Sequence, residues 1–140
     1  MKAVSGLNHV TLCCSPGQLA TVQDFYEAVL GLKTGPRPSF DFPGAWLYAG
    51  QQPIVHLAAV LPEPFAGTDS TSGAPAVLPG AVPSTGAIDH IALRAIATVD
   101  EVRTLLRAHD VSFTEAPVPG FPLYQVFCHD PLGVKIELNF

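Results

Sequence analysis

The chain has 140 residues, of which 48% are hydrophobic and 14% charged, and its formal net charge is -5. A chain of this length buries roughly two thirds of its unfolded surface as a single domain, and no apolar run reaches the ~18 residues of a membrane span. Its seven lysines and arginines form no cluster, which excludes the positive surface that nucleic acids and anionic membranes require, so we expect a small-molecule partner.

The N-terminal segment and the cysteines both indicate a cytoplasmic protein. Residues 1–15 alternate in polarity and lack the continuous apolar stretch and small-residue cleavage site of a secretory signal. Cys13 and Cys14 are adjacent, and neither they nor Cys128 belong to a C-x-x-C pair. We therefore expect reduced thiols rather than disulfides or a cysteine-bound zinc.

The first half of the chain predicts a strand, a helix and two further strands. Alternating polarity indicates strands, and apolar residues at three-and-four spacing indicate a helix that ends at Gly31. The expected elements are a strand at 8–12, a helix at 19–30 and strands at 45–49 and 53–60. The segment 61–86 follows, with five prolines and four glycines, and predicts a linker or lid that is either functional or a disordered connector.

The second half predicts the same order of elements. Thr98 and Glu101 resemble a capping box at the start of its helix. Pro131 and Gly133 supply the chemistry of a tight hairpin between its last two strands. The expected elements are a strand at 89–93, a helix at 99–106 and strands at 111–114, 123–129 and 134–139.

The two halves repeat one pattern at an offset of 81 residues. NHVTL at 8–12 reappears as DHIAL at 89–93, and IVHLA at 54–58 aligns with KIELN at 135–139. The helices match at a different offset, 77, if Thr21 is aligned with Thr98, which places a four-residue difference in the loop between strand and helix.

Four metal-ligating side chains stand at equivalent positions of this repeat, namely His9, His56, His90 and Glu137. One histidine in an apolar strand is more often a hydrogen-bonded core residue than a ligand. Three imidazoles and a carboxylate at equivalent positions are costly to bury unless they coordinate an ion. If the halves pair about a pseudo-twofold axis, the four converge on one divalent metal ion, for which Zn, Ni, Co, Mn and Fe are all suitable.

These motifs resemble the vicinal-oxygen-chelate superfamily, which includes glyoxalases, bleomycin resistance proteins and extradiol dioxygenases. The matching segments are 8–12, 24–32, 89–93 and 130–138. The resemblance implies an α+β fold of two paired βαβββ modules that form an open, cup-shaped mixed β-sheet around a metal site. The implied single domain has module one at about residues 4–60, a linker at 61–86 and module two at about 87–140.

The resemblance also implies roles for the four side chains. Members of the superfamily bind metal through a histidine on the first strand of each module and a glutamate on the last strand, which match His9, His90 and Glu137. The fourth place is glutamate in typical glyoxalase I and glutamine in methylmalonyl-CoA epimerase, whereas here it is His56. His56 is therefore either a fourth ligand or an acid/base.

Three functions remain open, in this order. The first is a lyase or isomerase acting on a small substrate with vicinal oxygens through a metal-stabilised enolate-like intermediate, with Glu137 or His56 moving the proton. The second is an Fe(II)-dependent extradiol-type ring-cleaving dioxygenase, although such enzymes have a tyrosine where this chain has Phe127. The third is a resistance protein of the fosfomycin or bleomycin type.

The sequence also offers candidate substrate-binding residues. Arg94 lies on the ligand face by strand alternation and can hold a carboxylate, or is a solvated strand-end arginine. Phe127, Trp46 and Tyr48 are candidates to line an apolar pocket, with core packing as the alternative, and Arg37 lies in a loop from which it can contact a substrate anion. Members of the superfamily often complete their cup across a dimer, so we expect a homodimer.

Overall fold

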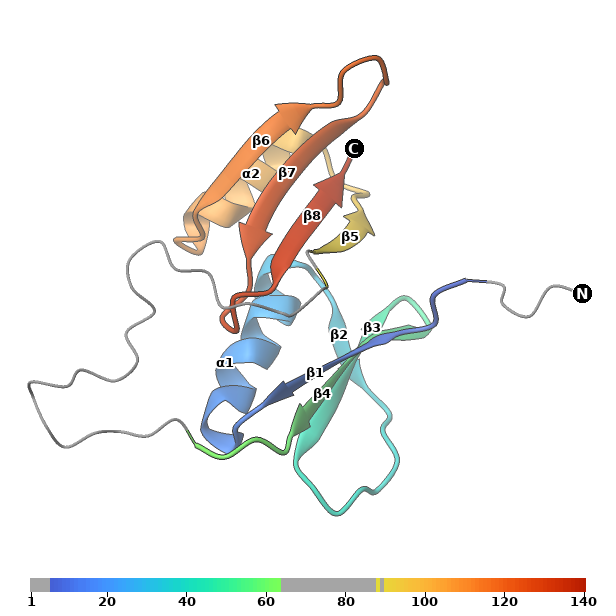
Figure 1. The fold of residues 1–140 in the computed structure, drawn as a ribbon, viewed down its shortest axis with the longest axis vertical. Coiled ribbons are helices and arrows are strands. Elements are labelled where there is room, and N and C mark those ends of the chain that lie inside the picture. Colours follow the sequence, from blue (N-terminus) through green and yellow to red (C-terminus); the bar gives the residue numbers. More distant parts are fainter. Residues whose placement is uncertain (1–5, 64–87, 89) are drawn as a thin grey trace, which may run out of the picture. The chain divides into compact units, whose positions relative to one another are not determined.

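A computed structural model describes residues 6–63, 88 and 90–140 (Figure 1). The chain divides into two compact units, Met1–Ala74 and Pro75–Phe140, which contain modules one and two and are described separately. Most of the predicted linker, from residue 64 on, lies outside the described residues, as does Asp89. No helix among the described residues is long and apolar enough to cross a membrane.

Module one is a four-stranded mixed sheet with one helical segment. Its elements are β1 (Val10–Cys14), a 3-10 turn (Pro16–Gln18), α1 (Leu19–Asp24), a π-helical turn (Phe25–Val29), β2 (Lys33–Gly35), β3 (Gly44–Ala49) and β4 (Gln52–Ala59). The strand order is β1-β4-β3-β2, with β1 and β4 parallel and the other pairs antiparallel. Val22 and Tyr26 of the helical segment and Leu47, Val55 and Leu57 of the sheet are at most 1% exposed and form its core.

Module two repeats this topology. Its elements are β5 (Ile91–Arg94), α2 (Val99–Ala108), β6 (Phe113–Pro117), β7 (Tyr124–His129) and β8 (Lys135–Asn139). The strand order is β5-β8-β7-β6, again with only the first pair parallel. Its core includes Leu106, Val126 and Ile136, each at most 1% exposed. The predicted α+β fold with two βαβββ modules is therefore confirmed.

Strand register confirms the offset of 81 residues. In module one His56 pairs with Thr11 on one side and with Trp46 on the other. In module two Glu137 pairs with Ala92 and with Phe127. These three residues lie 81 positions after His56, Thr11 and Trp46, respectively. Since residues paired across adjacent strands point to the same face, these rows of three form equivalent stripes in the two modules.

The helices depart from the prediction. Thr98 is the N-cap of α2 and makes the predicted capping box, in which its Oγ1 accepts from Glu101 N and its N donates to Glu101 Oε2. Thr21, in contrast, lies inside α1, and the residue that precedes the first helical turn is Ser15. The four-residue difference therefore lies in the helical segment, which begins earlier in module one, and not in the loop before it. At the offset of 77 the buried Phe25 and Val29 still correspond to the buried Val102 and Leu106.

The ends of the helices and the last hairpin follow the sequence prediction. Gly31 takes φ 73° after the helical segment of module one, and Asp110 takes φ 55° after α2. In both modules the backbone therefore leaves the helix through the left-handed region. Gly133 takes φ 83° in the hairpin before β8, where Asp130 Oδ1 accepts from the backbone N–H of Val134. The sequence did not predict β2, a three-residue strand.

Candidate metal and substrate site

The stripe around His56 lies on the face of the module-one sheet opposite its core. The two neighbours of His56 in β4, Val55 and Leu57, are 1% exposed, whereas His56 itself is partly exposed and Thr11 beside it is exposed. This alternation follows from the strand period of two residues. His56 therefore faces away from the hydrophobic core and toward space that a ligand can enter.

His56 is held between two other rings. Its ring centroid lies 3.9 Å from that of His9, at an interplanar angle of 15°, and 4.0 Å from that of Trp46, at 8°. His9 lies just before β1, and its Nδ1 is 2.8 Å from Asn8 Oδ1. Two of the predicted ligands, His9 and His56, are thus in direct contact.

The Nε2 atom of His56 is buried and has no hydrogen-bond partner in the described part of the chain. Burial lowers the pKa of His56, and the neighbouring imidazole of His9 lowers it further, while a hydrogen bond with the Pro53 backbone offsets part of the effect. The ring is therefore neutral near pH 7. A buried ring nitrogen without a partner costs free energy unless a ligand, an ion or a substrate atom satisfies it.

The equivalent stripe of module two brings His90 and Glu137 together. His90 Nε2 lies 3.2 Å from Glu137 Oε2, and Glu137 is 8% exposed. The other oxygen, Glu137 Oε1, accepts from Gln125 Nε2 and from Asn139 Nδ2, each at 2.8 Å. The two amides fix the orientation of the carboxylate and leave Oε2 directed at the histidine.

Comparison with solved structures reveals the fold family, whereas no family model and no curated protein sequence matches the chain. A glyoxalase family protein from Bacillus anthracis has 20% identity and a TM-score of 0.68, covering 99% of this chain and 97% of that one. Lactoylglutathione lyase from Agrobacterium tumefaciens has 22% identity and a TM-score of 0.64, covering 99% and 95%. The fosfomycin resistance protein FosX from Listeria monocytogenes has 16% identity and a TM-score of 0.64, covering 97% and 93%.

The chain has the glyoxalase fold. Its structural neighbours are proteins of the vicinal-oxygen-chelate superfamily, as the sequence motifs predicted. A mutant of FosX in this group was solved with Mn(II) and 1S,2S-dihydroxypropylphosphonic acid, which supports a divalent metal in the superfamily.

Each module carries two side chains of types that bind divalent metal ions. Module one supplies His9 and His56 with a buried, unsatisfied ring nitrogen, and module two supplies His90 with an oriented carboxylate at Glu137. Among the described residues no group of three or more metal-ligating side chains is gathered at one point. A shared ion bound by both pairs stays a prediction.

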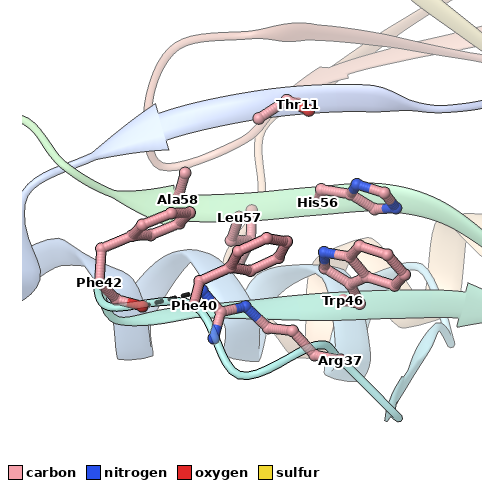
Figure 2. A pocket seen from close by; sticks show the side chains of 8 residues that line it. All are labelled: Thr11, Arg37, Phe40, Phe42, Trp46, His56, Leu57 and Ala58. Atoms are coloured by element: carbon pink, nitrogen blue, oxygen red, sulfur yellow. Dashed lines mark hydrogen bonds between the residues drawn. The ribbon is translucent and has the colours of Figure 1, made fainter.

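Of the predicted substrate residues, Trp46 lines a cavity of about 160 Å³ in module one (Figure 2). The cavity is lined by Thr11, Arg37, Phe40, Phe42, Trp46, His56, Leu57 and Ala58. Tyr48 is not in this set: its ring lies against Gly35, and its hydroxyl donates to Pro36 O at 2.7 Å.

The remaining predicted residues belong to module two. Phe127 is the cross-strand partner of Glu137, and Arg94 is an exposed residue at the end of β5, paired with Asn139. Sequence reasoning missed the amides Gln125 and Asn139. Strand alternation places Asn139 on the face of Glu137, which is a signal that was available, whereas Gln125 required the register of β7 against β8.

Proposed function

We propose that this protein is a divalent-metal-dependent enzyme of the glyoxalase type, a lyase or isomerase that acts on a small substrate with vicinal oxygens. The observation that carries the proposal is the unsatisfied, buried Nε2 of His56 on a sheet face equivalent to the one that carries His90 and Glu137. Structural likeness to lactoylglutathione lyase supports this class of reaction.

In this proposal His9, His90 and Glu137 hold the metal ion. When bound, such an ion supplies Lewis acidity that polarises the oxygens of a chelating substrate. Glu137 suits the role of a ligand because its Oε1 already accepts two amide hydrogen bonds, which fix the direction of the carboxylate.

His56 takes the role of the base. Its Nε2 has no competing partner in the described part of the chain, and burial keeps the ring neutral so that it can accept a proton near pH 7. Stacking between His9 and Trp46 fixes the plane of the ring and hence the direction of Nε2. In this proposal His56 takes the place that is glutamate in typical glyoxalase I and glutamine in methylmalonyl-CoA epimerase.

Metal analysis tests these assignments. We expect His9→Ala, His90→Ala and Glu137→Ala to lose metal after anaerobic purification, and His56→Gln to keep metal but lose turnover of 2-oxoaldehyde or hemithioacetal substrates. His109→Ala is the matched control, because His109 is an exposed histidine at the end of α2. Unchanged metal content in all three ligand variants would exclude the site.

A fosfomycin-type resistance activity is the second candidate. It is favoured by the likeness to FosX, including the mutant solved with Mn(II) and a dihydroxypropylphosphonic acid. Incubation of the metal-loaded protein with fosfomycin, followed by phosphorus NMR, separates the two, since only a resistance enzyme converts fosfomycin into another phosphonate with a different phosphorus signal. The extradiol alternative ranks lower because Phe127, with no hydroxyl, lies opposite Glu137. Iron-dependent oxygen uptake with catechols would reverse that ranking.

The proposal includes a cytoplasmic homodimer. Because His9 belongs to module one and His90 and Glu137 to module two, the proposed metal site can form within one chain or between two chains. Sedimentation and metal analysis of the same sample distinguish these arrangements: a monomer with one metal ion per chain would exclude a site formed by exchange of modules.

A further inference from the structure

The cavity of module one has the size and lining of a binding site for one aromatic ring. Its volume of about 160 Å³ is close to the ~150 Å³ of an engineered apolar cavity that binds benzene. Figure 2 shows the rings of Phe40, Phe42 and Trp46 around this space, with Thr11 and His56 on the strands beside it. A single six-membered ring therefore fits this space.

Arg37 gives this apolar cavity a fixed positive charge. Its Nη2 donates to Phe42 O at 2.8 Å, and its Cζ lies 4.9 Å from the Phe40 ring centroid and 5.0 Å from that of Phe42. No carboxylate pairs with Arg37 among residues 6–63, 88 and 90–140. A guanidinium supported by aromatic rings and lacking a counter-ion is a favourable partner for a carboxylate.

The loop that carries Arg37 is fixed at both ends. At its start, Gly35 packs so closely on the Tyr48 ring that a Cβ would lie 2.7 Å from it, and the Tyr48 hydroxyl donates to Pro36 O. At its end, a Cβ on Gly44 would collide with Leu57 O. The loop therefore presents Arg37 without a large ordering cost on binding.

We infer that this cavity binds a single-ring aryl carboxylate, with the ring against Trp46, Phe40 and Phe42 and the carboxylate on Arg37. The inference names the substrate class of the site and in that respect rests on the proposed function. His56 lines the same cavity, so the bound ring lies beside the proposed base. Binding itself does not require a metal ion.

The test uses the fluorescence of Trp46, which is the only tryptophan in the chain. The full-length protein, kept metal-free with EDTA, is titrated with benzoate, with benzamide as the neutral analogue of the same shape, and with acetate as the anion without a ring. We expect saturable binding of benzoate, with benzamide and acetate each binding about tenfold more weakly, because each lacks one of the two recognised groups.

Variants locate the binding. We expect Arg37→Gln to weaken benzoate binding about tenfold, Arg37→Lys to weaken it less, and Phe40→Leu to weaken it about threefold. The matched controls are Arg107→Gln, whose Cζ lies 5.6 Å from the Phe113 ring in module two, and Phe121→Leu, an exposed phenylalanine. Neither control should change the affinity.

Equal affinity for benzoate and benzamide in the unmodified protein would overturn the inference without any substitution, and so would wild-type benzoate binding by Arg37→Gln. The inference and the proposed function fail separately. Metal binding and turnover of an aliphatic substrate without benzoate binding would remove only the inference. Benzoate binding by a protein that holds no metal and turns over no vicinal-oxygen substrate would remove only the proposed function.

Discussion

The two modules share strand order and register but hold their candidate ligands by different means. In module one the ligand face is aromatic, and His56 is fixed by stacking between His9 and Trp46. In module two the equivalent face is polar, and Glu137 is fixed by hydrogen bonds from two amides. The two modules therefore share strand order and register but differ in the side chains around the equivalent position. The face around His56 is suited to a neutral ring, and the face around Glu137 is suited to a carboxylate.

The largest expected effect tests whether the two modules unfold as separate units. Leu57 in module one and Leu106 in module two are each 1% exposed. Truncation of either to alanine should cost about 3 kcal/mol through lost burial and a residual cavity. Denaturation followed by Trp46 fluorescence reports module one, and far-UV circular dichroism reports both modules. We expect Leu57→Ala to shift the Trp46 transition much more than Leu106→Ala, and equal shifts would show one cooperative unit.

The second prediction separates the two ways of fixing a side chain of the proposed site. Asn139→Ala removes an amide donor from Glu137 Oε1 and should weaken metal binding about tenfold or more. Trp46→Leu removes one side of the His56 stack and should lower kcat while metal affinity stays near wild type, since His56 is assigned as the base. Metal titration with a chelating indicator and steady-state kinetics measure both, with Gln51→Ala, an exposed amide in module one, as the control. Loss of metal in Trp46→Leu would instead make His56 a ligand.

The third prediction concerns pH. Burial and the neighbouring His9 lower the pKa of His56 below its ordinary 6.5, whereas hydrogen bonds from the Arg103 guanidinium lower the pKa of Glu115 in module two below 4.5. In both cases the unfolded chain takes up the proton first as the pH falls. His56 therefore contributes a loss of stability that begins near pH 6.5, and Glu115 one that begins near pH 4.5.

Urea denaturation of the metal-free protein between pH 8 and pH 3 measures these losses. His56→Gln should reduce the decrease in the free energy of unfolding just below pH 6.5. Glu115→Gln should reduce the decrease in the free energy of unfolding below pH 4.5. A decline below pH 6.5 that persists unchanged in His56→Gln would contradict the first assignment.

The smallest expected effect compares the two helix ends. Gly31→Ala places a side chain at φ 73° with no atom within 4 Å of the new Cβ, so it should cost about 1 kcal/mol through backbone strain alone. Asp110→Gly should raise stability by about 0.5 kcal/mol, because relief at φ 55° exceeds the added freedom of the unfolded chain. Thermal denaturation gives both values, and effects of the same sign would refute the equivalence of the two positions.

The sequence by itself determined the order of most helices and strands along each module and the matching positions of His9, His56, His90 and Glu137 in the repeat. Strand periodicity, the Thr98 capping box and the turn before β8 are encoded by residues that are neighbours in the chain, so pattern rules predicted them. The earlier start of the module-one helix was not predicted because a capping residue is defined by geometry at the helix start. The strand β2 was missed because only its pairing with β3 makes those three residues a strand.

Only the tertiary structure decided how the ligand faces are built. The stack of His9, His56 and Trp46 joins side chains from three separate segments, and the unsatisfied Nε2 of His56 depends on what those neighbours exclude. Arg37 was visible as a loop arginine, but its charge became part of a cavity because the loop folds back so that Phe40 and Phe42 support the guanidinium. Contacts of this kind depend on the packing of distant segments, whereas periodicity records only which face of a strand each residue occupies.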